Sequence, residues 1–203
     1  IRGAAKPLSM MEGIDETFDA AFFIGYHSRR GTAFGFMEHS FSSSVVSEIR
    51  LNGRPFGEIG INSALAGSFG VPVVLVTGDK AATEETLSLQ RSVEVVAVKD
   101  AVSRLAAKGL HPRTATKLIR ESAARALKDL GRFTPFVVEP PIKVEVEFLN
   151  AGMADAAQMA PGVDRADGRT TSFTADRFLT GFRALDTMLT LASSTLERRS
   201  WGF

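Results

Sequence analysis

The spacing of apolar and polar positions along the chain predicts several strands of two kinds. Nearly continuous apolar runs at 19–26 and 71–78 are typical of strands buried on both faces, as in parallel or mixed sheets. A further strand is expected at 93–98. Apolar and charged residues alternate over 142–148, which predicts a strand with one polar face. The sequence therefore combines strands of parallel and antiparallel type.

A tight turn interrupts the next strand signal. The apolar run from Val45 to Leu51 leads into Asn52-Gly53, and both of these residues tolerate positive φ. This dipeptide after a strand predicts a two-residue hairpin.

Helical spacing separates the strands. Ile61, Leu65 and Phe69 recur at i, i+4 and i+8, which predicts one buried helical face and places Glu58 in the first turn. Asp79 is placed to cap the helix after it, and Pro112 to open another. The residues of that helix expected to point inward are Leu118, Ile119, Ala126 and Leu130. The helices expected after the first one lie at 80–90, 112–130, 151–159 and 176–196.

Alternating strand and helix signals predict an α/β fold, with a layered mixed sheet and helices on both sides. We interpret residues 1–203 as a single region, with a possible subdivision near 100–110. The length allows one sizeable core or two small ones.

Composition excludes several classes of function. Lys plus Arg (24) nearly balance Asp plus Glu (23), so no strong field attracts nucleic acid or a membrane surface. No apolar run is long enough to span a bilayer, and cytoplasmic localisation is the expectation. The chain has no cysteine, so any metal must be held by His, Asp or Glu.

Two of the three histidines lie just after the first buried strand. Ligands collect at the carboxyl ends of strands in α/β sheets, and His27 occupies that position. His39 follows across a glycine-containing segment that can bring both rings to one pocket, and Glu58 offers a third ligand at a helix start. The alternative for each histidine is a hydrogen-bonded structural imidazole, and for Glu58 a simple helix-start acid.

Other polar features indicate structure rather than chemistry. His111 precedes a proline at a helix start, which favours a structural role. The serine-rich run 40–47 has no G-x-S-x-G elbow, and the chain has no P-loop or G-x-G-x-x-G. Serine-nucleophile and nucleotide-binding functions are therefore poorly supported.

Several segments together resemble a known family. The stretches GYHS, MEHS, GEIGIN, VPVVLVTGD and MAPGV occur in order along the chain. With their surroundings they resemble the DppA-type D-aminopeptidases, which are zinc metallopeptidases, over essentially the whole length.

The resemblance implies a zinc-dependent aminopeptidase that acts on short peptides with a free amino terminus. Peptides that contain D-amino acids are the expected substrates. It implies that His27 and Glu58 are zinc ligands and that His39 is the catalytic residue. It also implies two zinc ions per complete subunit, a metal-bridged water that attacks the scissile carbonyl, and a homodecamer. Imidazole and carboxylate ligands suit such a centre.

The family's first metal motifs, Asp-x-Glu-Gly and Asn-Asp-x-His, do not occur in this sequence, which opens on Ile1. We therefore expect the numbered sequence to begin inside a longer gene product. The alternative is a non-catalytic ring-forming or peptide-binding subunit with an incomplete metal site. A hydrolase for amides other than peptides is a third possibility, because fold and metal do not fix the substrate.

Overall fold

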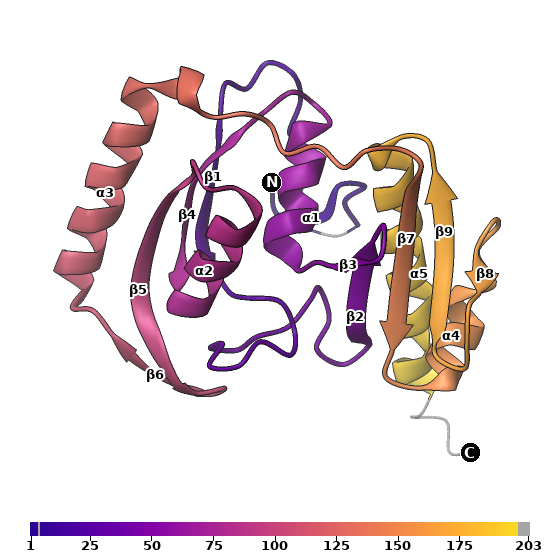
Figure 1. The fold of residues 1–203 in the computed structure, drawn as a ribbon. Helices are drawn as coiled ribbons and strands as arrows, with labels where there is room; N and C mark the ends of the chain where they lie inside the picture. Colours follow the sequence, from indigo (N-terminus) through magenta and orange to yellow (C-terminus); the bar gives the residue numbers. More distant parts are fainter. Residues whose placement is uncertain (4, 199–203) are drawn as a thin grey trace. The chain divides into compact units, whose positions relative to one another are not determined.

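The chain forms two compact units in a computed structural model that describes residues 1–3 and 5–198 (Figure 1). Unit 1 combines Ile1–Gly13, Ser40–Phe56 and Val138–Phe203, and unit 2 combines Ile14–His39 and Gly57–Val137. Residues 100–110, where the sequence suggested a subdivision, lie inside unit 2.

Unit 2 contains a mixed sheet with the strand order β1-β4-β5-β6. The first three strands are parallel, and β6 pairs with β5 in antiparallel fashion. Helix α3 lies on one side of this sheet, with α1 and α2 on the other (Figure 1). The expected layered mixed α/β arrangement is confirmed. The elements of unit 2 are β1 (Ala21–Tyr26), α1 (Glu58–Gly67), β4 (Val73–Asp79), α2 (Lys80–Leu89), β5 (Glu94–Ser103), β6 (Ala106–Gly109), α3 (Pro112–Lys128) and the 3-10 turn η2 (Leu130–Arg132).

Burial in unit 2 follows position in the sheet. All seven residues of β4 are buried because it is a central strand with helices packed against it. By contrast β1, predicted to be buried on both faces, is an edge strand of the described sheet, and only Phe23 is buried within it. Every residue of α1 is buried, where the spacing had predicted a single face. In α3 the prediction that Ala126 points inward is confirmed, but the prediction for Leu118 was wrong, because that side chain is 39% exposed. Ile119 and Leu130 are half-buried.

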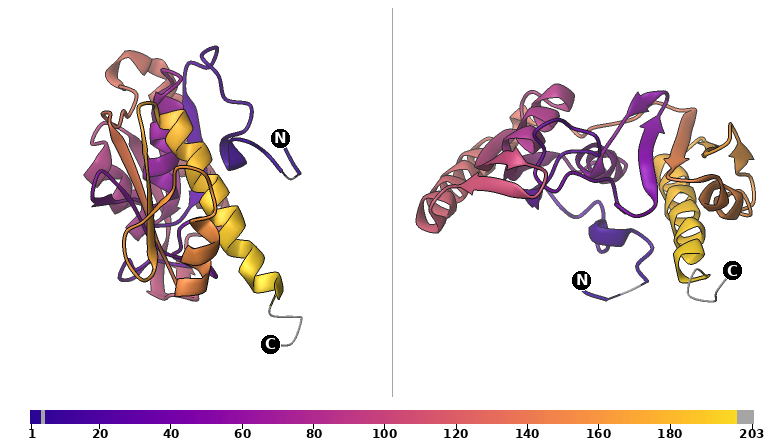
Figure 2. Two further views of the ribbon diagram at one scale, coloured as in Figure 1. Left: turned by 90° about the vertical axis from the view of Figure 1, so that its right-hand side faces the viewer. Right: turned by 90° about the horizontal axis from the view of Figure 1, so that it is seen from below.

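Unit 1 contains an antiparallel sheet with the strand order β3-β2-β7-β9-β8. Asn52 and Gly53 have φ of 49° and 77°, as the predicted hairpin turn requires. Helices α4 and α5 lie side by side and pack against β7 and β9 (Figure 2). The elements of unit 1 are the 3-10 turn η1 (Ser9–Met11), β2 (Val46–Leu51), β3 (Arg54–Pro55), β7 (Ile142–Phe148), α4 (Ala151–Ala157), β8 (Asp164–Arg165), β9 (Thr170–Ala175) and α5 (Phe178–Arg198).

Strand β7 shows the alternation that its sequence predicts. Ile142, Val144, Val146 and Phe148 are buried, and the charged residues between them are not. The apolar face of β7 packs against α5, and α5 contributes Phe182, Leu185 and Met188 to the buried core. Over residues 1–3 and 5–198, no helix has both the length and the apolar character needed to cross a membrane.

Candidate metal centre

The end of β1 places His27 at the carboxyl edge of the unit 2 sheet. Gly25 has φ of 79°, a conformation that glycine adopts without strain. Its N–H donates to Thr77 Oγ1 of the neighbouring strand β4 over 2.9 Å. This contact fixes the irregular last turn of β1, so the chain leaves the sheet in a defined direction just before His27.

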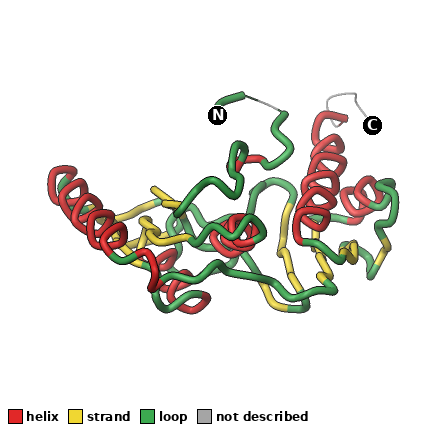
Figure 3. The backbone as a smooth tube through the Cα atoms, turned by 90° about the horizontal axis from the view of Figure 1, so that it is seen from above, coloured by secondary structure: helices red, strands yellow, loops and turns green. Residues whose placement is uncertain are grey.

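Residues 27–39 form a loop without helix or strand, and such loops are drawn in green in Figure 3. Backbone donors in such a segment have no ladder partners and need other acceptors. Side-chain carboxylates supply them: the Arg29 N–H donates to Glu85 Oε2 (2.7 Å) and the Phe36 N–H to Asp79 Oδ2 (3.0 Å). The loop is therefore held by α2 and its capping residue.

Glu58 is the first residue of α1 and is only 7% exposed. It follows Gly57, where an added Cβ would lie 2.6 Å from Arg29 Cβ and 2.9 Å from Glu85 Oε1. The absence of a side chain at Gly57 therefore lets the start of α1 approach the loop closely. This approach brings the Glu58 carboxylate to the two histidines.

His27, His39 and Glu58 converge on one point. The Nε2 atom of His27 lies 3.6 Å from Glu58 Oε2, and Nε2 of His39 lies 3.6 Å from Glu58 Oε1. The two imidazole rings stack with centroids 3.8 Å apart. One ligand atom from each residue falls within 4.8 Å of the other two.

Backbone carbonyls orient both rings. Nδ1 of His27 lies 3.0 Å from the Ser28 carbonyl oxygen, and Nδ1 of His39 lies 2.8 Å from that of Met37. A carbonyl oxygen only accepts, so we assign the hydrogen of each neutral ring to Nδ1. Each Nε2 then directs a lone pair toward the carboxylate, which is the arrangement of metal-ligating histidines.

Burial and nearby charges shift the pKa values of several groups around Glu58. Burial lowers the pKa of His27, but the hydrogen bonds to Glu58 and Ser28 and the nearby negative charges outweigh it, leaving the pKa raised. Burial raises the pKa of Glu85. Burial also raises the pKa of Tyr26 to about 12, partly opposed by its hydrogen bond with Asn62. The pocket therefore favours positive charge beside Glu58.

This donor set fits a zinc ion. Two imidazole nitrogens and one carboxylate oxygen are common zinc ligands, and catalytic sites use three protein ligands with a further position open. Across residues 1–3 and 5–198, it is the one group of three such side chains close enough to share an ion. The three residues that the sequence singled out for chemistry are thus brought together, although proximity alone does not separate ligand from catalyst.

The third histidine lies elsewhere and has another role. His111 is the N-cap of α3, and its Nδ1 accepts a hydrogen bond from the Arg113 N–H over 3.2 Å. This geometry agrees with the structural role predicted for it. Sequence reasoning gave Asp79 only a capping role and did not notice Glu85, because their second function depends on a loop conformation that periodicity does not predict.

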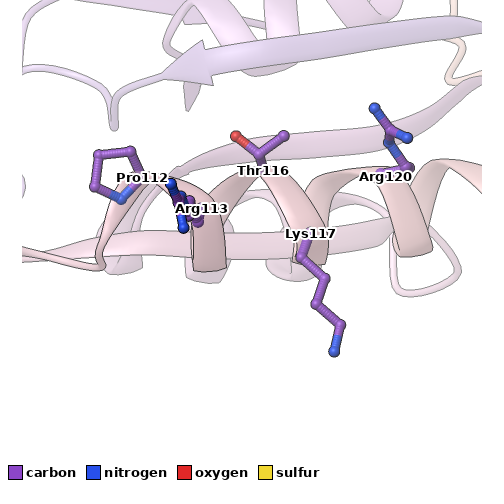
Figure 4. Close-up of a pocket in the computed structure, with 5 residues that line it drawn as sticks. All are labelled: Pro112, Arg113, Thr116, Lys117 and Arg120. Carbon is purple, nitrogen blue, oxygen red and sulfur yellow. The ribbon is translucent and has the colours of Figure 1, made fainter.

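A separate hollow on α3 has a different character (Figure 4). It contains basic side chains and no carboxylate or histidine, and Lys117 points away from Thr116 and Arg120 (Figure 4). It therefore lacks the ligand set of the metal centre. Its lining residues are Pro112, Arg113, Thr116, Lys117 and Arg120.

Comparisons with known proteins show which family the chain resembles. The model of peptidase family M55, described as D-aminopeptidase, matches residues 1–187. A D-aminopeptidase of Bacillus subtilis (strain 168) is 39% identical over 196 residues, which cover 96% of this chain and 71% of the relative. A solved structure, the zinc-dependent D-aminopeptidase DppA from Bacillus subtilis, described as a self-compartmentalizing protease, matches with a TM-score of 0.90. It is 38% identical, over 95% of this chain and 70% of that one.

Proposed function

Because the chain belongs to the M55 family of D-aminopeptidases, we propose that it hydrolyses short peptides with a free amino terminus, including those that begin with a D-amino acid. The observation that carries this proposal is the convergence of His27, His39 and Glu58 on one point. Enzymes of this family are zinc-dependent peptide hydrolases, as the description of the solved relative states for that protein.

In the proposed site, Glu58 and His27 hold the metal. Glu58 is almost fully buried, and its two carboxylate oxygens face the Nε2 atoms of the two histidines. His27 presents Nε2 to the same oxygen pair while the Ser28 carbonyl fixes its ring. A bound zinc ion lowers the pKa of a water molecule and polarises a carbonyl group.

His39 has the proposed catalytic role. Its side chain is 30% exposed, whereas that of His27 is 19% exposed, so His39 is the more accessible of the two to a substrate. With Nδ1 held by the Met37 carbonyl, its Nε2 faces the carboxylate and can accept a proton and return it. A second zinc ion per subunit, homodecameric assembly and cytoplasmic localisation stay predictions.

The alternative is a ring-forming or peptide-binding subunit without catalysis. The observation that favours it is that the described residues offer three ligand atoms, fewer than a paired zinc centre uses. Intact mass and zinc content of the purified full-length protein separate the two proposals. A mass near 21.8 kDa together with little zinc would support the binding subunit. A larger mass with about two zinc ions per chain would support the enzyme.

Variants of the three histidines and of Glu58 assign the roles. His27→Ala and Glu58→Gln are expected to lose zinc and activity together, and His39→Ala to retain zinc but lose turnover of an enantiomeric pair of aminoacyl p-nitroanilides. His111→Ala is the matched control, because that histidine caps α3, and it should keep both zinc and turnover. Wild-type turnover in His39→Ala would refute the catalytic assignment. Loss of zinc in that variant would make His39 a ligand.

A further inference from the structure

The turn between β5 and β6 makes close contact with the loop that carries His39. Arg104 lies in this turn, and its carbonyl oxygen accepts a hydrogen bond from the Met37 N–H over 2.7 Å. Its side chain donates from Nε to Glu38 Oε1 (3.0 Å) and from Nη2 to the Glu38 carbonyl oxygen (3.3 Å). One residue thus contacts both residues that precede His39.

The Met37 backbone connects this contact to the imidazole. Its N–H is bound to Arg104, and its carbonyl oxygen lies 2.8 Å from His39 Nδ1. Met37 also has φ of 53°, a left-handed conformation that is unfavourable for a residue with a Cβ. Such a conformation needs support from its surroundings. The hydrogen bond from the Met37 N–H to the Arg104 carbonyl oxygen supports the residue that orients His39.

Glu38 closes the loop on itself. While Oε1 accepts from Arg104, Oε2 accepts from the Gly31 N–H over 2.7 Å. The Glu38 side chain is 15% exposed and that of Arg104 is 49% exposed, so the carboxylate is the shielded member of this ion pair. The carboxylate therefore links the middle of the loop to the β5–β6 turn.

We infer that Arg104 is a positioning residue, which fixes the ring of His39 through Met37 and Glu38 and so holds Nε2 toward the metal centre. This inference rests on the proposed catalytic role of His39. Arginine suits the task because its planar fork can donate in two directions at once, to a carboxylate and to a carbonyl. A lysine would retain the charge but present a single point donor.

The test uses the full-length protein with Arg104→Ala and Arg104→Lys. Removing the fork frees the Glu38 side chain and carbonyl, while the backbone bond from Met37 to the residue 104 carbonyl can remain. We expect kcat to fall about 10- to 100-fold in Arg104→Ala, as for residues that orient metal-site groups, with KM and zinc content nearly unchanged. Arg104→Lys should recover part of kcat. Arg120→Ala on the exposed face of α3 is the matched control and should leave kcat unchanged.

A crystal structure of Arg104→Ala gives a readout that does not depend on activity. The contact between His39 Nδ1 and the Met37 carbonyl should be lost or the ring should occupy more than one orientation. An unchanged kcat with the ring in place would overturn the inference, and so would a rise in KM at constant kcat, which would indicate substrate binding. If Arg104→Ala does not fold, Glu38→Gln, which keeps the side-chain size, carries the same two measurements.

The two proposals can fail separately. If the wild-type protein has no peptidase activity but Arg104→Ala still displaces the His39 ring, the proposed function is wrong and the positioning stands. If the wild type is active and Arg104→Ala leaves both kcat and the ring unchanged, the positioning is wrong and the function stands.

Discussion

Unit 1 and unit 2 each contain a sheet covered by helices, but their polar side chains make different kinds of contact. On the β7–β9 sheet of unit 1, Lys143 pairs with Glu145 and Arg169 with Glu147 at the surface. In unit 2, Asp79 and Thr77 are 1% exposed and accept hydrogen bonds from backbone N–H groups. In unit 1 the surface ion pairs lie beside a regular backbone hydrogen-bond ladder between strands. In unit 2 the buried side chains accept from backbone N–H groups that no such ladder satisfies.

This difference indicates which substitutions should destabilise each unit most. A regular strand satisfies its own backbone, and its surface ion pairs contribute little to stability. An irregular segment such as 27–39 depends on particular side chains, and losing one leaves a donor unpaired. The same substitution should therefore cost more in unit 2 than in unit 1, and matched pairs of variants can test this.

The largest difference is expected between two helical glycines. A Cβ at Gly67 in α1 would lie 2.0 Å from the Phe136 carbonyl oxygen, so the backbone must move. Gly67→Ala should lower the free energy of unfolding by about 3 kcal/mol. A Cβ at Gly181 in α5 would have Val144 Cγ2 as its nearest neighbour, at 3.1 Å, and the gain of about 1 kcal/mol in helix propensity offsets that contact. Urea unfolding of the full-length variants measures both, and equal losses would contradict the comparison.

The second difference is expected between two helix caps. Asn150 accepts from the Met153 N–H at the start of α4, so Asn150→Ala should cost about 1 kcal/mol. Asp79 caps α2 through Oδ1 and also accepts from the Phe36 N–H through Oδ2. Asp79→Ala should therefore cost about 2 to 3 kcal/mol, because it leaves a second donor unpaired.

A companion readout shows whether the extra cost comes from the loop. Hydrogen exchange at the Phe36 amide should accelerate in Asp79→Ala, and that amide should keep its protection in Asn150→Ala. Unchanged exchange at Phe36 would show that Asp79 contributes only its cap.

The third difference is smaller and involves two buried threonines. Thr77 accepts from the Gly25 N–H beside the centre, and Thr77→Val should cost about 1 to 2 kcal/mol because the donor loses its partner. Thr171 donates to the Met188 sulfur, a weak acceptor, so Thr171→Val should change stability by less than about 0.5 kcal/mol. Thermal unfolding of the two variants checks the order. A larger loss in Thr171→Val would reverse the comparison.

The same contrast explains what the sequence could predict. The alternation in β7, the turn at Asn52-Gly53 and the apolar run of β4 follow from local periodicity, and each is confirmed. His27 and Glu58 lie at the ends of such elements, so their convergence was open to inference from strand and helix order. His39 lies in a loop, so its approach to the same pocket was inferred from the glycines before it, and its catalytic role came from the resemblance alone.

The acceptors around that loop could not be predicted. Glu85 and Arg104 are separated from the residues they contact by 56 and 66 positions in the chain. No period relates them, since their contacts depend on how residues 27–39 fold back. Strand β1 shows the same limit, because its apolar run does not reveal that it lies at the edge of the described sheet.

The smallest effects are expected at two carboxyl groups, and they have opposite signs. At Glu94 in unit 2, burial raises the pKa but hydrogen bonds from Arg132 and Arg125 outweigh it, so the pKa lies below 4.5. Its stabilisation is therefore present above pH 4.5 and is lost as pH falls through the folded-state pKa. Glu94→Gln should cost less than about 1 kcal/mol at neutral pH, and the difference from wild type should vanish in acid.

At Asp186 in α5 of unit 1, burial raises the pKa above 3.8, and the sign reverses. The folded protein then binds the proton more tightly than the unfolded chain does, so ionisation at neutral pH opposes folding. Asp186→Asn should raise the melting temperature slightly at neutral pH and lose this advantage as pH falls through the folded-state pKa toward 3.8. Thermal unfolding of both variants at several pH values tests the pair. The opposing outcome is that both variants melt below the wild type at neutral pH and match it in acid. That result would show that the ionised Asp186 has a stabilising partner, as Glu94 does, and would contradict the contrast between the two units.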